Sequence, residues 1–179
     1  MTALFLCPLN APSVYAQESP TYSLSAKAGL LLPSSIYVDP PDVYYDTGVG
    51  VFSWFDADAF IGSHFSLGVA VIASALPLTE IDVSGSLLSA GLTFKGRFQI
   101  DQIGIKPGLL IAYQAIIADV IDVSNGLNLG AQVELTYGEA NLKPAVQIGF
   151  VTQPTGGAEC CEVLFSPIFY LSAGVVYSN

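Results

Sequence analysis

The sequence predicts an all-β fold: an eight-stranded antiparallel up-and-down transmembrane β-barrel with long outer loops and short turns at the other end. Hydrophobic residues make up 52% of the 179 residues and charged residues only 11%, whereas about 25% charged residues is usual in soluble domains. No run of about 20 apolar residues offers a membrane-spanning helix. Segments that alternate between apolar and polar residues are frequent instead. Such a chain can satisfy its backbone in lipid only as a closed barrel.

The stretch 86–100, SLLSAGLTFKGRFQI, shows which face of the strands meets the lipid. Successive side chains of a strand face opposite sides, so Leu92, Phe94 and Phe98 share one face and Lys95 and Arg97 the other. All five cations of the chain fall on the polar parity of their segments: Lys27, Lys95, Arg97, Lys106 and Lys143. A cation facing lipid at mid-depth costs about 2–4 kcal/mol. We therefore expect the apolar faces outside and the polar faces in the lumen.

Taken in order, eight segments alternate in this way. They are residues 22–32, 49–61, 64–76, 86–100, 103–117, 126–138, 142–152 and 168–179. Their connections alternate in length, with long acidic loops at 33–48, 77–85, 119–125 and 153–167 and tight turns at 62–63, 101–102 and 139–141. Barrels of bacterial outer membranes place long loops outside and short turns in the periplasm. This pattern predicts that both termini are periplasmic.

The N-terminal segment has the features of a targeting sequence. Residues 1–16 are mostly apolar and end in Val14-Tyr15-Ala16, where signal peptidase requires small residues near the cut. The basic start of a signal peptide is missing, so a clipped signal and a disordered tail both stay open. We expect residues 1–16 to be a signal peptide and residues 17–179 to form a single barrel domain.

Aromatic residues recur on the apolar faces at the turn-side ends of the strands. They are Tyr22, Phe65, Phe98, Tyr137 and Tyr177. Tyrosine and other aromatic residues gather at the level of lipid headgroups, so this set predicts an interfacial girdle. The alternative is that they are core residues of a soluble, lipocalin-like barrel, whose exterior would then consist of serine, glycine and few charges.

The segments after residue 20 resemble the eight-stranded outer-membrane barrel superfamily that includes the small OmpA-, OmpX- and OmpW-type proteins. In the last segment, Ser172, Gly174 and Tyr177 match the recognition signal of the outer-membrane assembly machinery, although Asn179 stands where a phenylalanine is usual. The resemblance implies an integral protein of a Gram-negative outer membrane. Its implied partners are outer-membrane lipid, lipopolysaccharide and the assembly machinery.

The ionisable residues of the polar faces lie in the turn-side half of the barrel. They are Lys27, Asp56, Asp58, Lys95, Arg97, Lys106, Glu134 and Lys143. Unpaired charges are costly in a narrow lumen, so this set predicts an ionic plug. Because five cations face three acids, an electropositive gate for an anion is the alternative.

The outer half of the lumen is expected to be apolar. The residues with inward parity there are Phe52, Trp54, Ile72, Leu87, Leu110, Ile116 and Tyr170. These side chains either fill the barrel or form a pocket that opens outward. The likeness to OmpW-type proteins implies passage of small hydrophobic molecules through such a pocket.

Evidence for catalysis or cofactors is weak. His64 and Ser66 match the His-x-Ser of outer-membrane lipid A deacylases, but they sit beside a predicted periplasmic turn, whereas those enzymes act at the outer leaflet. We expect no enzyme activity, no cofactor and no metal site. Cys160 and Cys161 would form a strained disulfide, an intermolecular bridge or free thiols. The net charge of −10 argues against nucleic acid as a partner.

The sequence therefore favours a non-enzymatic outer-membrane barrel that is either membrane-structural or a narrow pore for small solutes, hydrophobic ones included. The alternative function is surface binding or adhesion through the acidic outer loops. A lipid A-modifying enzyme is the least favoured alternative. No particular small-molecule ligand is indicated.

Overall fold

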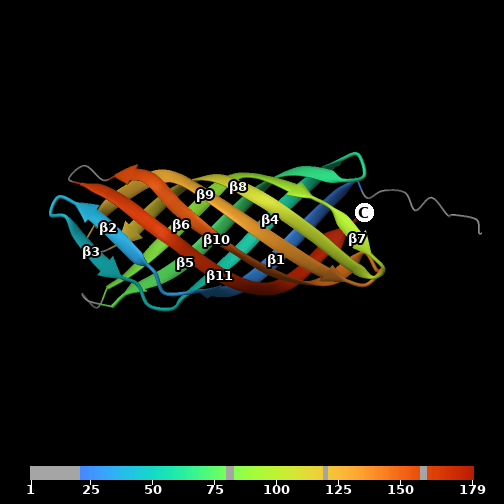
Figure 1. Cartoon of the computed structure of the whole chain (residues 1–179), viewed down its shortest axis with the longest axis horizontal. Coiled ribbons are helices and arrows are strands. Elements are labelled where there is room, and N and C mark those ends of the chain that lie inside the picture. The colour runs from blue at the N-terminus through green and yellow to red at the C-terminus, as the bar shows by residue number, and fades with distance from the viewer. Residues whose placement is uncertain (1–20, 80–82, 119–120, 158–160) are drawn as a thin grey trace, which may run out of the picture.

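The computed structural model describes residues 21–79, 83–118, 121–157 and 161–179, and these form one closed barrel (Figure 1). The predicted signal peptide lies outside the described residues and stays a prediction. The strands are β1 (Tyr22–Leu31), β2 (Ser35–Asp39), β3 (Val43–Asp46), β4 (Gly50–Ile61), β5 (Phe65–Leu78), β6 (Val83–Gly96), β7 (Phe98–Ile100), β8 (Ile103–Ala118), β9 (Ile121–Tyr137), β10 (Leu142–Gly157) and β11 (Glu162–Ser178).

The wall follows the chain in an up-and-down antiparallel order, which confirms the predicted fold class. The strand order is β1-β4-β5-β6-β8-β9-β10-β11, and β7 continues the line of β6 along β8. The barrel closes where β1 pairs with β11, from Ser23 opposite Ser178 to Leu31 opposite Tyr170. The described residues contain no helix that is long and apolar enough to cross a membrane.

The first connection is ordered as a hairpin, so the prediction of an irregular loop over 33–48 was wrong. Strand β2 pairs with the outer end of β11, and Thr47 after β3 bridges Leu78 of β5. The hairpin thus takes the place of β1 and β4 in the wall at the outer end (Figure 1). Ile36 and Val38 of β2 are buried. Their alternation is short and lies among prolines and acids, which is why the sequence did not single it out.

The other outer connections are also shorter than predicted, because the strands continue beyond their expected ends. Strand β10 runs to Gly157 and β11 begins at Glu162, within the expected loop 153–167. Between Val151 and Gln153 the pairing moves from Ile168 to Phe165, which places an extra residue in β11. Between Thr152 and Thr155 it moves from Leu129 to Leu127, which places an extra residue in β10. A bulge adds one residue to one strand and reverses the inward parity after it. The period of two is therefore lost at the point where the sequence indicated a loop.

The two faces of the wall have the predicted orientation. Large apolar side chains such as Val69, Leu92 and Ile111 are 56–57% exposed on the outer surface. Lys95, Glu134 and Gln147 are fully buried inside. This arrangement is the reverse of a soluble barrel and fits a lipid surround. Both ends of the described chain lie at the end of the barrel opposite the β2–β3 hairpin (Figure 1), but which side of a membrane that end faces stays a prediction.

We expect Gly174→Val to impair closure of the barrel. Gly174 lies opposite Lys27 in the β1–β11 seam, and a Cβ atom at this position would meet the carbonyl oxygen of Ala26 and the Cα of Lys27. Refolding into detergent, followed by the heat-dependent shift in gel mobility, measures the folded fraction. Ala173→Val, on the exposed face of the same strand, is the matched control and should refold like the unaltered chain. Equal folded fractions for the two variants would contradict this role for Gly174.

Candidate functional site

Six charged side chains form one continuous chain of ion pairs across the lumen. The order is Asp58, Lys95, Asp56, Lys27, Glu134 and Lys106, with the signs alternating at every step. The Nζ atom of Lys95 lies 2.7 Å from Asp56 Oδ1 and 2.8 Å from Asp58 Oδ2. Lys27 joins Asp56 at 3.0 Å and also contacts Glu134, which in turn pairs with Lys106 at 3.0 Å. We call these six residues the ion-pair chain.

The ion-pair chain connects strands that are not neighbours in the wall. Lys27 on β1 reaches Glu134 on β9 across the lumen, whereas Lys106 and Glu134 are directly opposed on β8 and β9. Strand β5 lies between β4 and β6, and beside the ion-pair chain its inward residues are the small Ser66, Gly68 and Ala70. A Cβ on Gly68 would collide with the side chains of Asp58 and Thr93. Glycine at this position therefore leaves room for β4 and β6 to meet above β5.

Neutral side chains complete the hydrogen bonding of the two aspartates. The indole Nε1 of Trp54 donates to Asp56 Oδ2 at 2.7 Å, and Ser25 donates to the same oxygen. Thr93 donates to Asp58 Oδ1 at 3.0 Å. Ser25, Thr93 and Gly68 were not identified from the sequence. Their shared inward parity marked them as lumen residues, but nothing in the pattern indicated which charge each would meet.

The composition of the ion-pair chain makes its burial tolerable. Its six side chains are between 0% and 8% exposed. Moving a charge out of water costs several kcal/mol, which is offset only when the partners and the remaining hydrogen bonds are in place. Three lysines face three carboxylates, so the group carries no net charge. It can therefore fill the lumen as a compact ionic layer.

Arg97 and Lys143 do not belong to this layer, which corrects the predicted grouping of five cations with three acids. Both are half-buried and lie beside the turn-side opening. Neither forms an ion pair with any residue in the part of the chain that the structure describes. The two additional cations lie at the turn-side opening, which Glu139 also lines, and not within the ion-pair chain.

Amides and hydroxyls form two further buried groups in the lumen, of which the second lines the cavity of the outer half. Gln147 Nε2 donates to Gln132 Oε1 at 2.7 Å and to Tyr170 Oη at 2.9 Å. A second group joins Gln114, Gln153, Asn128 and Ser89 through bonds of 2.9–3.1 Å. These polar residues were also missed, although they share the inward parity of the charges.

The outer half of the lumen is packed with apolar side chains. Of the residues predicted there, Phe52, Trp54, Ile72, Leu87, Leu110 and Tyr170 are at most 9% exposed and belong to one buried cluster. The side chain of Ile116 lies outside the described part. Phe52 and Trp54 pack against the Tyr170 ring with centroids 5.3 and 5.8 Å apart. The cavity among them measures about 30 Å³, which is room for about two water molecules.

The predicted girdle residues lie on the outer surface near the turn-side end. Tyr22, Phe65, Phe98, Tyr137 and Tyr177 are 36–60% exposed. The Tyr22 and Tyr177 rings lie 6.3 Å apart across the closing seam. Their contact with lipid headgroups stays a prediction.

His64 and Ser66 do not form a catalytic pair in the structure. Strand parity predicts that both side chains face inward, but His64 is exposed in the turn before β5 and only Ser66 is buried in the lumen. Cys160 lies outside the described residues and Cys161 is half-buried. Among the residues that can be described, no group of three His, Cys, Asp or Glu side chains could hold a metal ion.

Comparison with known proteins identifies the fold. No family model matches the sequence, and no curated protein matches it. Neisserial surface protein A (NspA) has a similar structure, with a TM-score of 0.62 at 14% identity over 88% of this chain and 96% of that one. Two weaker similarities are to Ail of Yersinia pestis (TM-score 0.48, 10% identity, 89% and 99% covered) and to the outer membrane protein AlkL (0.45, 14%, 95% of each). The chain therefore has the fold of the eight-stranded outer-membrane β-barrels.

Proposed function

We propose that this chain is a non-enzymatic, integral outer-membrane protein with a membrane-structural role, whose lumen is closed to solutes. The observation that carries the proposal is the filling of the lumen by charged, amide and apolar side chains. The ion-pair chain, the buried amides and the apolar cluster leave a cavity of only about 30 Å³ among the lining residues. This argues for a rigid body anchored in lipid.

The outer-membrane location is supported by the wall and by the likeness in fold to NspA. The exposed surface is apolar, and the charged side chains of the turn-side half point inward. Insertion by the assembly machinery and contact with lipopolysaccharide follow from that location and are part of the proposal.

A pore for small solutes is the weaker alternative. An ion crossing the barrel would have to displace one member of a buried ion pair. The other member would then be left without its partner and without water to solvate its charge. A hydrophobic solute would have to displace Phe52, Trp54 and Tyr170, whose rings pack against one another. Both routes require side chains to leave well-packed positions.

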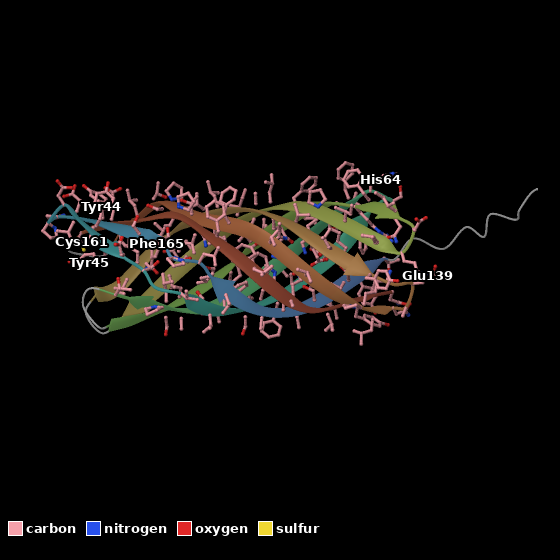
Figure 2. The ribbon with its side chains drawn as sticks, turned by 60° about the horizontal axis from the view of Figure 1, so that its bottom comes forward. Tyr44, Tyr45, His64, Glu139, Cys161 and Phe165 are labelled. Carbon is pink, nitrogen blue, oxygen red and sulfur yellow. The ribbon has the colours of Figure 1, made fainter. Side chains whose placement is uncertain are left out.

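Surface binding is the second candidate, and the β2–β3 hairpin favours it. Tyr44 is 63% exposed and its ring lies 4.9 Å from that of Tyr37. Figure 2 shows Tyr44 and Cys161 at the outer end of the barrel. Deleting the whole segment 34–47 is a poor test, because it would remove Ile36 and Val38 from the core. Tyr44→Ala alters only the exposed face, so loss of surface binding with intact insertion would support this function.

In planar bilayers, the unaltered protein should show no conductance above that of a protein-free membrane. Arg97→Ala should be equally silent, because the Arg97 side chain lies outside the ion-pair chain. Discrete conductance steps in the unaltered protein that change in Lys95→Ala would contradict a closed lumen. They would establish the pore instead.

Lys95→Met should destabilise the barrel by about 3–5 kcal/mol, since it leaves Asp56 and Asp58 buried without their shared cation. Urea unfolding in lipid vesicles measures this, and the single tryptophan, hydrogen-bonded to Asp56, provides the fluorescence signal. Lys143→Met is the matched control and should change the stability by less than about 0.5 kcal/mol. If the two variants unfold at the same urea concentration, the ion-pair chain does not stabilise the barrel.

At the hairpin tip, a hydrogen bond of 2.9 Å to the Asp42 carboxylate raises the pKa of Tyr37 to about 12. The folded tip thus favours the protonated phenol. The bond is fully present below the ordinary value of about 10 and is lost as the pH rises toward 12. Absorbance titration of the unaltered chain minus Tyr37→Phe isolates this residue among the nine tyrosines. Asp42→Asn should return the midpoint toward 10, and an unchanged midpoint would exclude the hydrogen bond as the cause.

A further inference from the structure

A hollow lies at the turn-side opening of the barrel, separate from the filled part of the lumen. It measures about 1090 Å³ and is lined by polar side chains that include Thr21, Ser63, Gln99 and Asn141. Figure 2 shows His64 and Glu139, which also line it, at this end of the barrel. We call it the turn-side hollow.

Two cations point to the chemistry of the hollow. The Arg97 guanidinium stacks 5.2 Å from the centre of the Phe60 ring. Its backbone N–H donates to the His64 carbonyl at 2.7 Å, which ties Arg97 to the turn before β5. Lys143 of β10 lines the same hollow as Arg97. Two half-buried cations, Arg97 and Lys143, therefore lie in the turn-side hollow.

Neither cation is neutralised as the lumen lysines are. Each of the other three cations, Lys27, Lys95 and Lys106, has a carboxylate within 3.0 Å. Arg97 and Lys143 have no such partner among the residues given by the structure, although the exposed Glu139 acts on Lys143 from a longer range. The chain has a net charge of −10 and therefore many carboxylates, yet none of the described ones pairs with these two cations. Their positive charges are thus available to an anion from outside the protein.

The donor set fits a phosphate group better than a lone halide. An arginine presents its N–H groups as a planar fork that matches two oxygens of a phosphate, and a lysine adds a point charge. The side-chain amide of Asn141 and the second N–H of the Gln99 amide offer neutral donors around them. The Thr21 hydroxyl already donates to the Asn179 carbonyl, and the Ser63 hydroxyl pairs with His64 Nδ1. Several oxygens of one tetrahedral group can be bound in this way.

One side of the hollow is apolar and continuous with the outer wall. Phe98 and Ile100 of β7 line it and are 55% and 60% exposed. Ile105 of β8 lies opposite Phe98 and lines it too. A phosphate bound at Arg97 could therefore carry acyl chains that lie along these side chains.

We propose that the turn-side hollow binds a phosphate group through Arg97 and Lys143. The source is either free phosphate or the headgroup of a phospholipid. The lipid source rests on the membrane location proposed above, whereas binding of free phosphate does not. The outcomes below therefore separate failure of this site from failure of the proposed function, which the bilayer recordings test independently.

The experiment is calorimetric titration of the full chain, refolded in a non-ionic detergent, with two probes. One is inorganic phosphate and the other is dihexanoyl phosphatidic acid, with dihexanoylglycerol as the control for apolar partitioning. Arg97→Gln and Lys143→Gln should each weaken binding about tenfold or more, because each removes a charge-assisted contact. Arg97→Lys combined with Lys143→Arg keeps both charges and should retain more binding than the double glutamine variant. Glu139→Gln removes the carboxylate of the hollow and should strengthen binding.

Each outcome of the titrations either supports or overturns the phosphate site. Saturable binding of inorganic phosphate that is lost in the double glutamine variant supports the site with free phosphate as its source. Binding of the lipid but not of inorganic phosphate or dihexanoylglycerol, lost in the same variant, supports a headgroup source. Absence of binding of both probes to the unaltered chain overturns the proposal. Binding that persists unchanged in the double variant, while its gel mobility shows a folded barrel, overturns it as well.

Discussion

The structure depends on the rule that a charge buried away from water must be paired. Asp56 shows how far this rule extends. Its two oxygens accept hydrogen bonds from Lys27, Lys95, Ser25 and Trp54. These donors come from β1, β4 and β6, so one carboxylate ties three strands of the wall together. Because each lysine also meets a second carboxylate, the constraint extends to β8 and β9 through Glu134. A lipid-facing exterior offers no place for these charges, which is why they are gathered inside.

The interior above the charges follows a different principle. The outer half is packed like the core of a soluble protein, with Leu31, Phe52, Leu76 and Phe165 among its buried members. Strand β1 ends at Leu31 and strand β4 begins at Gly50, so beyond these residues they do not shield the apolar core from solvent. The β2–β3 hairpin shields the core there by extending the wall and adding buried side chains of its own. The hairpin is therefore part of the fold rather than a free loop, and only its tip is available to a partner.

The sequence allowed the orientation of the strands to be predicted, but not the partners inside the lumen. Orientation depends only on a period of two, so Lys95 was assigned inward and Leu92 outward correctly. Contact across the lumen depends on how far neighbouring strands are staggered, which no single strand encodes. Arg97 and Lys143 share the parity of Lys95 and Lys27, yet they lie too near the turns to join them. Bulges in β10 and β11 obscured the outer strand ends in the sequence for a related reason, since a bulge changes the parity itself.

The separation of charge along the barrel follows from the same constraint. The three inner lysines balance three carboxylates, so the other charged side chains of the described residues lie toward the two ends. The outer hairpin carries Asp39, Asp42 and Asp46 and no cation, whereas at the turn side Arg97 and Lys143 are accompanied by Asp101 and Glu139. Charges at the rims remain near water, where an ion-pair partner adds little stability, so they need no internal partner. The two ends are therefore where this barrel can distinguish its surroundings, while the lumen between them serves to hold the wall together.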